Sequence, residues 1–147
     1  MATLLHLDSS PLESSVTREL TREFVNTWRA AHPEGTVIYR DLAANPLKPL
    51  DAAWIGASFT PEADRTPEQK KVLAVSDELI DELQAIDEYV VGVAMHNFSI
   101  PSVLKLWIDQ VVRRGRTFAY GENGPQGLLK GKKAIGNEAR KAARLPG

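Results

Sequence analysis

Hydroxyl-bearing residues gather at one point near the start of the chain. The sequence S-S-P-L-E-S-S-V-T-R at residues 9–18 lies between a short apolar run and a stretch with helical spacing of apolar residues. Serine hydroxyls and the unpaired N–H groups at the start of a helix bind phosphate oxygens, and the helix dipole favours their negative charge. The segment has neither the lysine of a P-loop nor a G-x-G-x-x-G pattern, which argues against a nucleoside triphosphate or a dinucleotide. The segment therefore allows two predictions. Either Ser14 or Ser15 serves only as the cap of a helix, or the loop binds the phosphate of a ligand that is neither a nucleoside triphosphate nor a dinucleotide.

A second segment whose residues could bind a ligand follows a β-branched run at residues 89–94. The side chains of Met95, His96, Asn97 and Phe98 come directly after it, and Pro101 then favours the start of a helix. In an open α/β sheet, such a loop leaves the carboxyl end of a strand and opens into the crevice where ligands bind. Amide groups there can hydrogen-bond the edge of a heteroaromatic ring, while Met and Phe lie against its face. The alternative is an ordinary turn that only caps the helix.

Strands at residues 3–8, 36–40 and 89–94 and helices between them would position these two loops. The first helix carries Val16, Leu20, Phe24 and Trp28 at a four-residue spacing, which predicts one apolar face against a sheet. Between residues 41 and 65 the sequence predicts a long connection, and a loop of that length is usually functional or an interaction surface.

After residue 65 the sequence predicts three further elements. Thr66 begins a T-x-x-Q capping box, and the buried face predicted for that helix is Val72, Val75, Leu79, Ile80 and Leu83. Its acids, Asp77, Glu78, Asp81 and Glu82, are interpreted as a solvated face without metal. A stripe of Val103, Leu104, Trp107, Ile108 and Val111 predicts the next helix, on which Lys105, Asp109 and Arg113 are expected to pair. A glycine-rich hairpin is predicted over residues 117–131.

The composition and the absence of certain motifs argue against several classes of function. The chain has 147 residues, a net charge of −1 and no cysteine, which gives no basic footprint for nucleic acid and excludes thiol chemistry. No stretch approaches the roughly 20 apolar residues that span a bilayer, so the sequence predicts a cytoplasmic protein without a membrane partner. His6, His32 and His96 lack metal-ligand spacing, and no G-x-S-x-G elbow suggests a hydrolase.

Two long strings identify a family. The strings M-H-N-F-S-I-P-S-V-L-K-L-W-I-D and R-x-G-R-T-F-A-Y-G-E-N-G-P-Q-G-L-L-K-G-K-K-A resemble the FMN-dependent NADH-azoreductases, a quinone-reductase-like family with a flavodoxin-like fold. That family reads P-M-Y-N-F where this chain has Ala94 and His96, and S-S-P-x-x-x-S-V-S-R where this chain has Thr17. The resemblance implies an α/β, flavodoxin-like three-layer sandwich with a parallel sheet.

The resemblance also implies roles for individual residues. Ser10, Ser15, Val16 through its backbone, and Thr17 would contact the FMN phosphate. The ring would lie against Met95 and Phe98 and accept hydrogen bonds from or donate them to Asn97 and the loop amides, and His96 is counted with this cofactor-binding segment. Phe59 and Tyr120 are candidates for the substrate side, Phe59 in the pocket of the other subunit of a homodimer, although both are equally compatible with simple packing. No protein side chain is expected to act as acid, base or nucleophile, and His96 is not expected to be essential.

The last residues depart from the family. A fourth strand should begin at residues 132–135 but is predicted not to continue, because residues 136–147 are polar, basic and poor in β-branched residues. The chain is therefore interpreted as a partial FMN-binding domain at 1–135 with a divergent polar tail at 136–147, incomplete at its C-terminus. Strand order 2-1-3-4-5 would then leave one side of the third strand unpaired. A tail helix capped by Asn137 is the alternative.

The leading functional hypothesis is an oxidoreductase in which NADH reduces FMN and the flavin reduces a quinone or azo compound in a ping-pong cycle. One alternative is a flavodoxin-like electron carrier, which the serine-rich loop and near-neutral charge disfavour. The other is an inactive fragment that cannot retain flavin.

Overall fold

The computed structural model describes residues 2–11, 15–93, 101–129 and 132–138, the side chains of Tyr120 and residues 133–138 excepted. The chain divides into two compact units. The first comprises Met1–Leu47, Ile86–Lys105 and Gly131–Gly147, and the second Lys48–Ala85 and Leu106–Lys130. No helix in the described ranges is long and apolar enough to cross a membrane. The predicted division at residue 135 remains a prediction.

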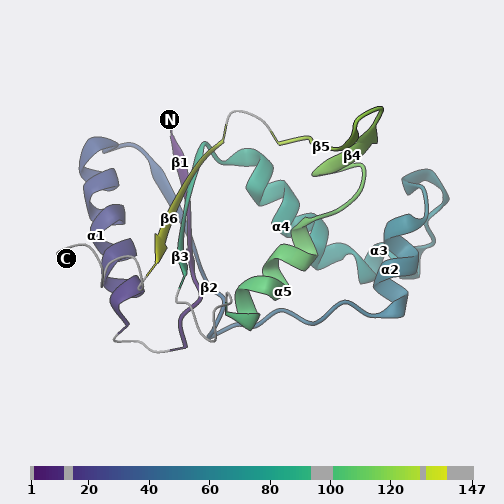
Figure 1. The fold of residues 1–147 in the computed structure, drawn as a ribbon, viewed down its shortest axis with the longest axis horizontal. Helices are drawn as coiled ribbons and strands as arrows, with labels where there is room; N and C mark the ends of the chain where they lie inside the picture. The colour runs from purple at the N-terminus through teal and green to yellow at the C-terminus, as the bar shows by residue number, and fades with distance from the viewer. Residues whose placement is uncertain (1, 12–14, 94–100, 130–131, 139–147) are drawn as a thin grey trace. The chain divides into compact units, whose positions relative to one another are not determined.

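The first unit is built on a parallel sheet (Figure 1). Its strands are β1 (Thr3–Asp8), β2 (Thr36–Asp41), β3 (Glu88–Val93) and β6 (Lys133–Glu138), in the order β2-β1-β3-β6. In β1, Leu4, Leu5 and Leu7 are all fully buried, as expected for a central strand with both faces covered. The three strands predicted from the apolar runs are thereby confirmed, and so is the flavodoxin-like parallel sheet.

The prediction that the fourth strand stops after Ile135 is wrong. β6 continues to Glu138 and pairs in parallel with β3 along its whole length, with Val91 opposite Gly136 and Val93 opposite Glu138. The side of β3 expected to be unpaired is therefore occupied. Strand pairing uses backbone N–H and C=O groups, which Gly, Asn and Glu supply as well as β-branched residues do. Asn137 lies in this strand, so the alternative of a helix capped by Asn137 is also wrong.

Helix α1 (Val16–Ala31) packs against the sheet of this unit, beside β1, β3 and β6. Ser15 is its N-cap, as predicted, but the buried face is Thr17, Arg18, Thr21, Val25 and Trp28, and Val16 is 50% exposed. A strict four-residue spacing drifts by about 40° per step around a helix, so the predicted stripe could not stay on one face.

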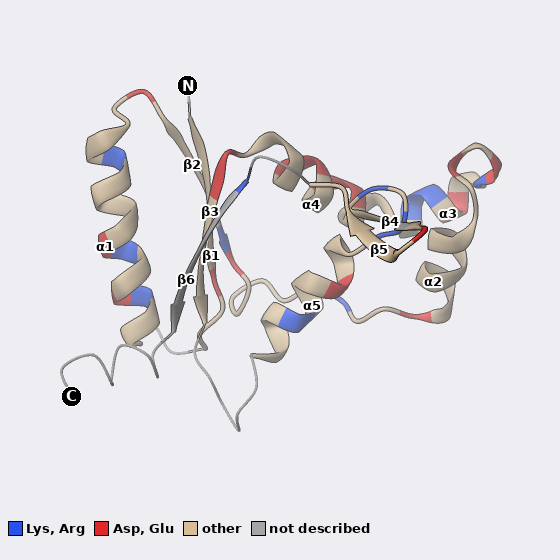
Figure 2. Ribbon diagram, turned by 45° about the horizontal axis from the view of Figure 1, so that its top comes forward, with Lys and Arg blue, Asp and Glu red and all other residues tan. Residues whose placement is uncertain are grey.

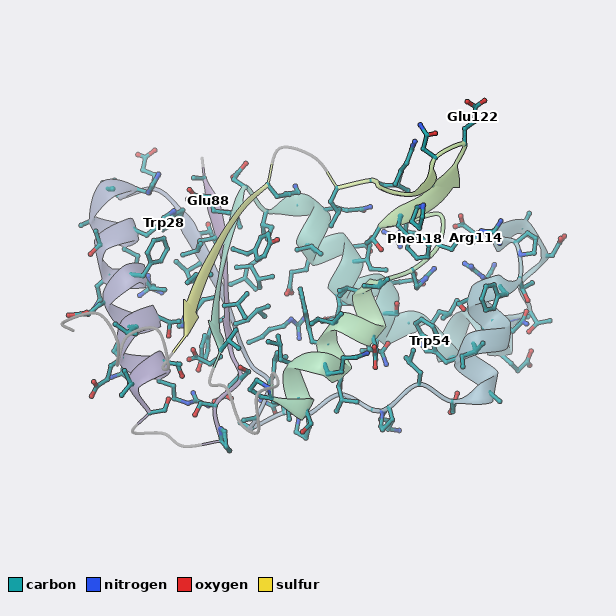
Figure 3. The ribbon with its side chains drawn as sticks, viewed as in Figure 1. Trp28, Trp54, Glu88, Arg114, Phe118 and Glu122 are labelled. Carbon is teal, nitrogen blue, oxygen red and sulfur yellow. The ribbon has the colours of Figure 1, made fainter. Side chains whose placement is uncertain are left out.

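The N-terminal core joins α1 to the strands. Trp28 packs with Leu4, Val25 and Val90, and its indole Nε1 donates to Glu88 Oε2 at 2.5 Å. Figure 3 labels both residues. Gly35 follows the helix at a point where a Cβ would lie only 2.6 Å from the Trp28 ring, so a side chain there would displace the indole.

The second unit consists of short helices and a hairpin. Its elements are α2 (Ala52–Phe59), η1 (Glu62–Asp64), α3 (Pro67–Val72), α4 (Ala74–Ala85), the latter part of α5 (Ser102–Val111), β4 (Phe118–Gly121) and β5 (Gly124–Gly127). The connection predicted as a long loop thus contains α2, whose Trp54 and Ala57 form a small core with Leu73 and Leu50. The hairpin is confirmed by antiparallel pairing of β4 with β5, and Gly124 supplies the positive φ of its turn.

The Thr66 capping box is present, but the helix that it begins ends at Val72, with Leu73 as its C-cap, and α4 starts at Ala74. The break changes the helical phase. Val72 and Val75 are therefore exposed rather than buried, whereas Leu73 and Ser76 are fully buried; Leu79, Ile80 and Leu83 are buried as predicted.

The acidic residues of α4, visible in red in Figure 2, are only partly a solvated face. Arg113 lies beyond the end of α5 and pairs with Asp77, so its predicted pairing along α5 is wrong. Arg116 donates to Asp77 at 3.2 Å and to Asp81 at 2.6 Å. These contacts tie α4 to the turn after α5.

Candidate functional site

The serine-rich loop leaves β1 at the carboxyl edge of the parallel sheet. Asp8, Ser9 and Ser10 are buried there, and the Ser9 hydroxyl donates to the carbonyl oxygen of Gly92 at 2.5 Å. This bond attaches the start of the loop to β3. Because ligands of open α/β sheets bind at this edge, the loop has the position that a ligand site requires.

The other end of the loop is the first turn of α1. Ser15 Oγ accepts the backbone N–H of Arg18 at 3.2 Å and lies 3.1 Å from the Thr17 hydroxyl. The first N–H groups of a helix have no partner within the helix. The structure therefore brings three of the predicted phosphate residues, Ser15, Val16 and Thr17, together at a helix start, with Thr17 buried and Val16 exposed.

Arg18 joins the two ends of the loop. Its Nη2 donates to the backbone oxygen of Ser10 at 2.7 Å and to Asp41 Oδ1 at 2.9 Å. Its Nη1 donates to Tyr39 at 3.2 Å and reaches Asp8 Oδ2 at 3.4 Å. Ser10, the fourth predicted phosphate residue, is thereby held to the helix that carries the other three.

The contacts by which Arg18 joins the two ends of the loop, called the Arg18 clamp below, were not predicted from the sequence. The sequence nevertheless contains a signal for them. Asp8 ends β1 and Asp41 ends β2, and the two are register partners in the sheet. Two neighbouring carboxylates at a buried edge require a cation, and Arg18 was the basic residue nearest to the loop in sequence.

Asp8 is the most heavily bonded acid of the site. Its carboxylate accepts from Tyr39 at 2.8 Å and Thr21 at 2.9 Å and lies 3.1 Å from His6 Nε2. Burial raises the pKa of Asp8, but the hydrogen bonds from His6, Tyr39 and Thr21 and the attraction of His6 outweigh it and hold the pKa below its ordinary value. Asp8 is therefore a fixed negative charge.

The same contacts shift the pKa of the neighbouring groups. The hydrogen bond from Arg18 is the main cause that lowers the pKa of Asp41, and the bond to Asp41 is the main cause that raises the pKa of Arg18. Burial, followed by the bond to Asp8, raises the pKa of Tyr39 to about 12. The Arg18 charge is thus largely balanced by carboxylates.

A phosphate at this loop would therefore meet hydroxyls, backbone N–H groups and the dipole of a sixteen-residue helix rather than an unbalanced cation. These donors fit a phosphate monoester. Among the described residues no group of His, Cys, Asp and Glu is arranged to hold a metal ion.

The remaining predicted residues lie elsewhere. Met95, His96, Asn97 and Phe98 are outside the described residues. Phe59 ends α2 in the second unit and is 68% exposed, and Tyr120 lies in β4 with its side chain outside the description. The structure therefore brings the predicted phosphate residues together, and the phosphate, ring and substrate contacts themselves stay predictions.

A parallel sheet in this order, with a hydroxyl-lined loop between its central strand and first helix, defines a flavodoxin-like α/β protein. The chain belongs to the family described as "Flavodoxin-like fold", whose sequence model matches residues 2–136.

Individual relatives have more specific descriptions. The chain is 67% identical over 134 residues to an FMN-dependent NADH:quinone oxidoreductase of Acidobacterium capsulatum, covering 91% of this chain and 65% of the relative. It is 52% identical over 136 residues to the protein of the same description from Nostoc punctiforme, covering 92% of this chain and 66% of the relative. The chain thus spans just under two thirds of the length of these relatives.

Two solved structures share the fold. An azoreductase from Bacillus anthracis str. Sterne superposes with a TM-score of 0.84 at 31% identity, covering 94% of this chain and 68% of the other. An FMN-dependent NADH-azoreductase from Bacillus anthracis str. Ames Ancestor, solved in complex with FMN, superposes with a TM-score of 0.81 at 25% identity and the same coverage.

Proposed function

We propose that this chain acts in an FMN-dependent oxidoreductase that uses NADH to reduce quinones or azo compounds. The observation that carries the proposal is the 67% identity to an FMN-dependent NADH:quinone oxidoreductase. The hydroxyl-lined helix start at Ser15 and Thr17 supports it, because its donors suit the phosphate of FMN.

In this proposal Ser10, Ser15, the backbone of Val16 and Thr17 hold the phosphate. Arg18 contacts no ligand but keeps the Ser10 backbone next to the helix start through bonds of 2.7 Å to Ser10 and 2.9 Å to Asp41. The segment with Met95, His96, Asn97 and Phe98 would hold the flavin ring by its face and edge. Phe59 and Tyr120 would lie on the substrate side.

Bound FMN would supply the redox chemistry, taking two electrons from NADH and passing two to the acceptor in a ping-pong cycle. The protein binds and orients the reactants, and no side chain is required as acid, base or nucleophile. His96 substitutions should therefore leave the pH dependence of turnover largely unchanged. We further propose that the protein forms a homodimer in the cytoplasm.

The test is retention of flavin by the purified chain. FMN is added, unbound flavin is removed, and the visible spectrum is followed while NADH is added without oxygen. Retained flavin absorbance that bleaches with NADH would support the oxidoreductase. Flavin that is retained but not bleached would favour an electron carrier instead, and a folded chain that retains none would overturn FMN binding.

A matched pair of variants locates the site. Thr17→Val removes a hydroxyl at the helix start, and Thr27→Val makes the same change on an exposed part of the same helix. FMN retention should fall in the first variant and not in the second. Equal retention would contradict the role of Thr17.

A further inference from the structure

The second unit contains a cavity of about 360 Å³ that shares no residue with the phosphate loop. Its lining is dominated by guanidinium groups, with one carboxylate and one aromatic ring. The residues that carry this character are Arg65, Arg113, Arg114, Arg116, Glu62 and Phe59.

Three of the arginines come from one fixed turn, residues 112–117. Gly115 has φ +85°, which favours glycine, and its N–H donates to Phe118 O at 2.8 Å. The Thr117 hydroxyl donates to Val111 O at 2.7 Å and accepts the Arg113 N–H at 2.9 Å. The turn thus sets the backbone positions from which Arg113, Arg114 and Arg116 reach the cavity. Figure 3 labels Arg114 beside Phe118.

The arginines of the cavity are only partly balanced by acids. Asp77 and Asp81 pair with Arg113 and Arg116. Arg65 is held instead by two carbonyl oxygens at the end of α2, Ala57 O at 3.0 Å and Ser58 O at 3.5 Å. Within the described residues it pairs with no carboxylate. Carbonyl oxygens hold a guanidinium group in place without neutralising its charge.

Arg113 adds a buried donor. The residue is 2% exposed, and its Nε has no hydrogen-bond partner among the described residues. A buried donor without a partner is costly. Arg113 also lines the cavity, so its guanidinium charge adds to those of the other three arginines there.

Phe59 gives the cavity an aromatic wall. It is the last residue of α2 and, among the residues that the structure describes, the most exposed of the large apolar side chains. An aromatic ring of a ligand can stack on it, and the cavity volume is at the lower end of the range for small-molecule sites. We propose that the cavity binds a small aromatic carboxylate, with the carboxylate held by the arginines and the ring against Phe59. This inference does not require bound FMN, but it shares Phe59 with the substrate side of the proposed function.

The test uses 2-naphthoate and its neutral analogue 2-naphthamide as probes in isothermal titration of the full-length chain. Charge-assisted hydrogen bonds should make the naphthoate bind at least about tenfold more tightly. Inorganic phosphate should bind more weakly than naphthoate because it has no ring. Equal affinity for the two naphthalene probes, or no saturable binding of naphthoate, would overturn the proposal. Phosphate binding as tightly as naphthoate would overturn the aromatic part.

Variants give effects of opposite sign. Arg114→Gln removes an exposed cavity arginine and should weaken naphthoate binding several-fold, whereas Glu62→Gln removes the lining carboxylate and should strengthen it. Phe59→Ser should weaken both naphthalene probes. Arg29→Gln, on the exposed side of α1 in the other unit, is the control and should change neither. Circular dichroism verifies folding, and an Arg29→Gln effect equal to that of Arg114→Gln would show that only overall charge matters.

Discussion

Each unit of this chain contains a network in which arginine pairs with two carboxylates, one arginine in the first unit and two in the second, and the two networks differ in burial. In the first unit, the Asp8 network comprises His6, Asp8, Arg18, Tyr39 and Asp41. Its charged side chains are largely buried: Asp8 is 6% exposed, Arg18 10% and Asp41 21%. In the second unit, the Asp77 network comprises Asp77, Asp81, Arg113 and Arg116, and its side chains range from 1% exposed at Arg113 to 69% at Asp81.

The difference indicates what each network does. A buried ion pair is stable only when further hydrogen bonds satisfy its atoms, and Asp8 obtains them from Thr21, Tyr39 and His6. One arm of the Asp8 network ends on the backbone of Ser10, in the candidate phosphate loop. The Asp77 network instead joins α4 to the arginine-bearing turn, and much of it is screened by solvent.

Asp8→Asn should have the largest effect on stability. The new amide has one acceptor oxygen, so its NH2 group would face the hydroxyl donor of either Thr21 or Tyr39, which donate to different oxygens of Asp8, and the change would remove a charge partner of Arg18. Breaking a buried pair in this way costs on the order of 3 kcal/mol. Denaturant unfolding followed by circular dichroism measures the loss, and a loss below about 1 kcal/mol would show that the network is more hydrated than its burial indicates.

Arg18→Gln should show whether Arg18 positions the phosphate loop or only stabilises the fold. Loss of the clamp releases the Ser10 backbone, so FMN should bind about tenfold more weakly, a change of about 1.4 kcal/mol. Riboflavin, which lacks the phosphate, should be unaffected. Flavin fluorescence titration measures both ligands, with Arg22→Gln on the exposed face of α1 as the control. Equal weakening of FMN and riboflavin would mean that Arg18 acts only on the fold.

The fold was largely predictable because apolar runs and caps act locally. The strand at residues 3–8, the Ser15 cap and the Thr66 capping box all depend on neighbours within a few residues. The start of β6 was predicted, but its continuation beyond Ile135 was not, because that pairing depends on the free edge of β3 rather than on the composition of β6. The exposed positions of Val72 and Val75 result from a helix break at Leu73 that periodicity alone does not reveal.

Residues of the candidate site were predictable only where they lie next to one another in the sequence. Ser15, Val16 and Thr17 are consecutive, so a motif identifies them. Arg18 and Asp41 are 23 positions apart in sequence, and their contact exists only because β1 and β2 pair in parallel. Arg113 likewise pairs across 36 positions with Asp77, which helical spacing could not indicate.

Tyr39→Phe should reduce the alkaline sensitivity of the first unit. The pKa of Tyr39 is raised from 10.0 to about 12, so the folded state favours the neutral phenol. That contribution to stability is fully present below pH 10 and is lost as the pH rises through about 12. The stability difference between the native chain and Tyr39→Phe should therefore narrow between pH 10 and 12. Because Tyr39 is half exposed, the effect should be smaller than those of the Asp8 and Arg18 variants. Urea unfolding across that range provides the measurement, and a constant difference would contradict the raised pKa.

Asp81→Asn should have the smallest effect on stability, because Asp81 has the most exposed side chain of the Asp77 network. Asp81 is largely solvated, and Arg116 keeps its bonds to Asp77 at 3.2 Å and to the side chain of Gln84 at 3.1 Å when Asp81 is removed. Exposed pairs contribute between zero and about 1 kcal/mol, and salt screens them. We expect a loss of about 0.5 kcal/mol at low ionic strength that disappears at high ionic strength. A loss as large as that of Asp8→Asn, or one that salt does not reduce, would show that the Asp77 network is as tightly coupled as the Asp8 network and that burial does not distinguish them.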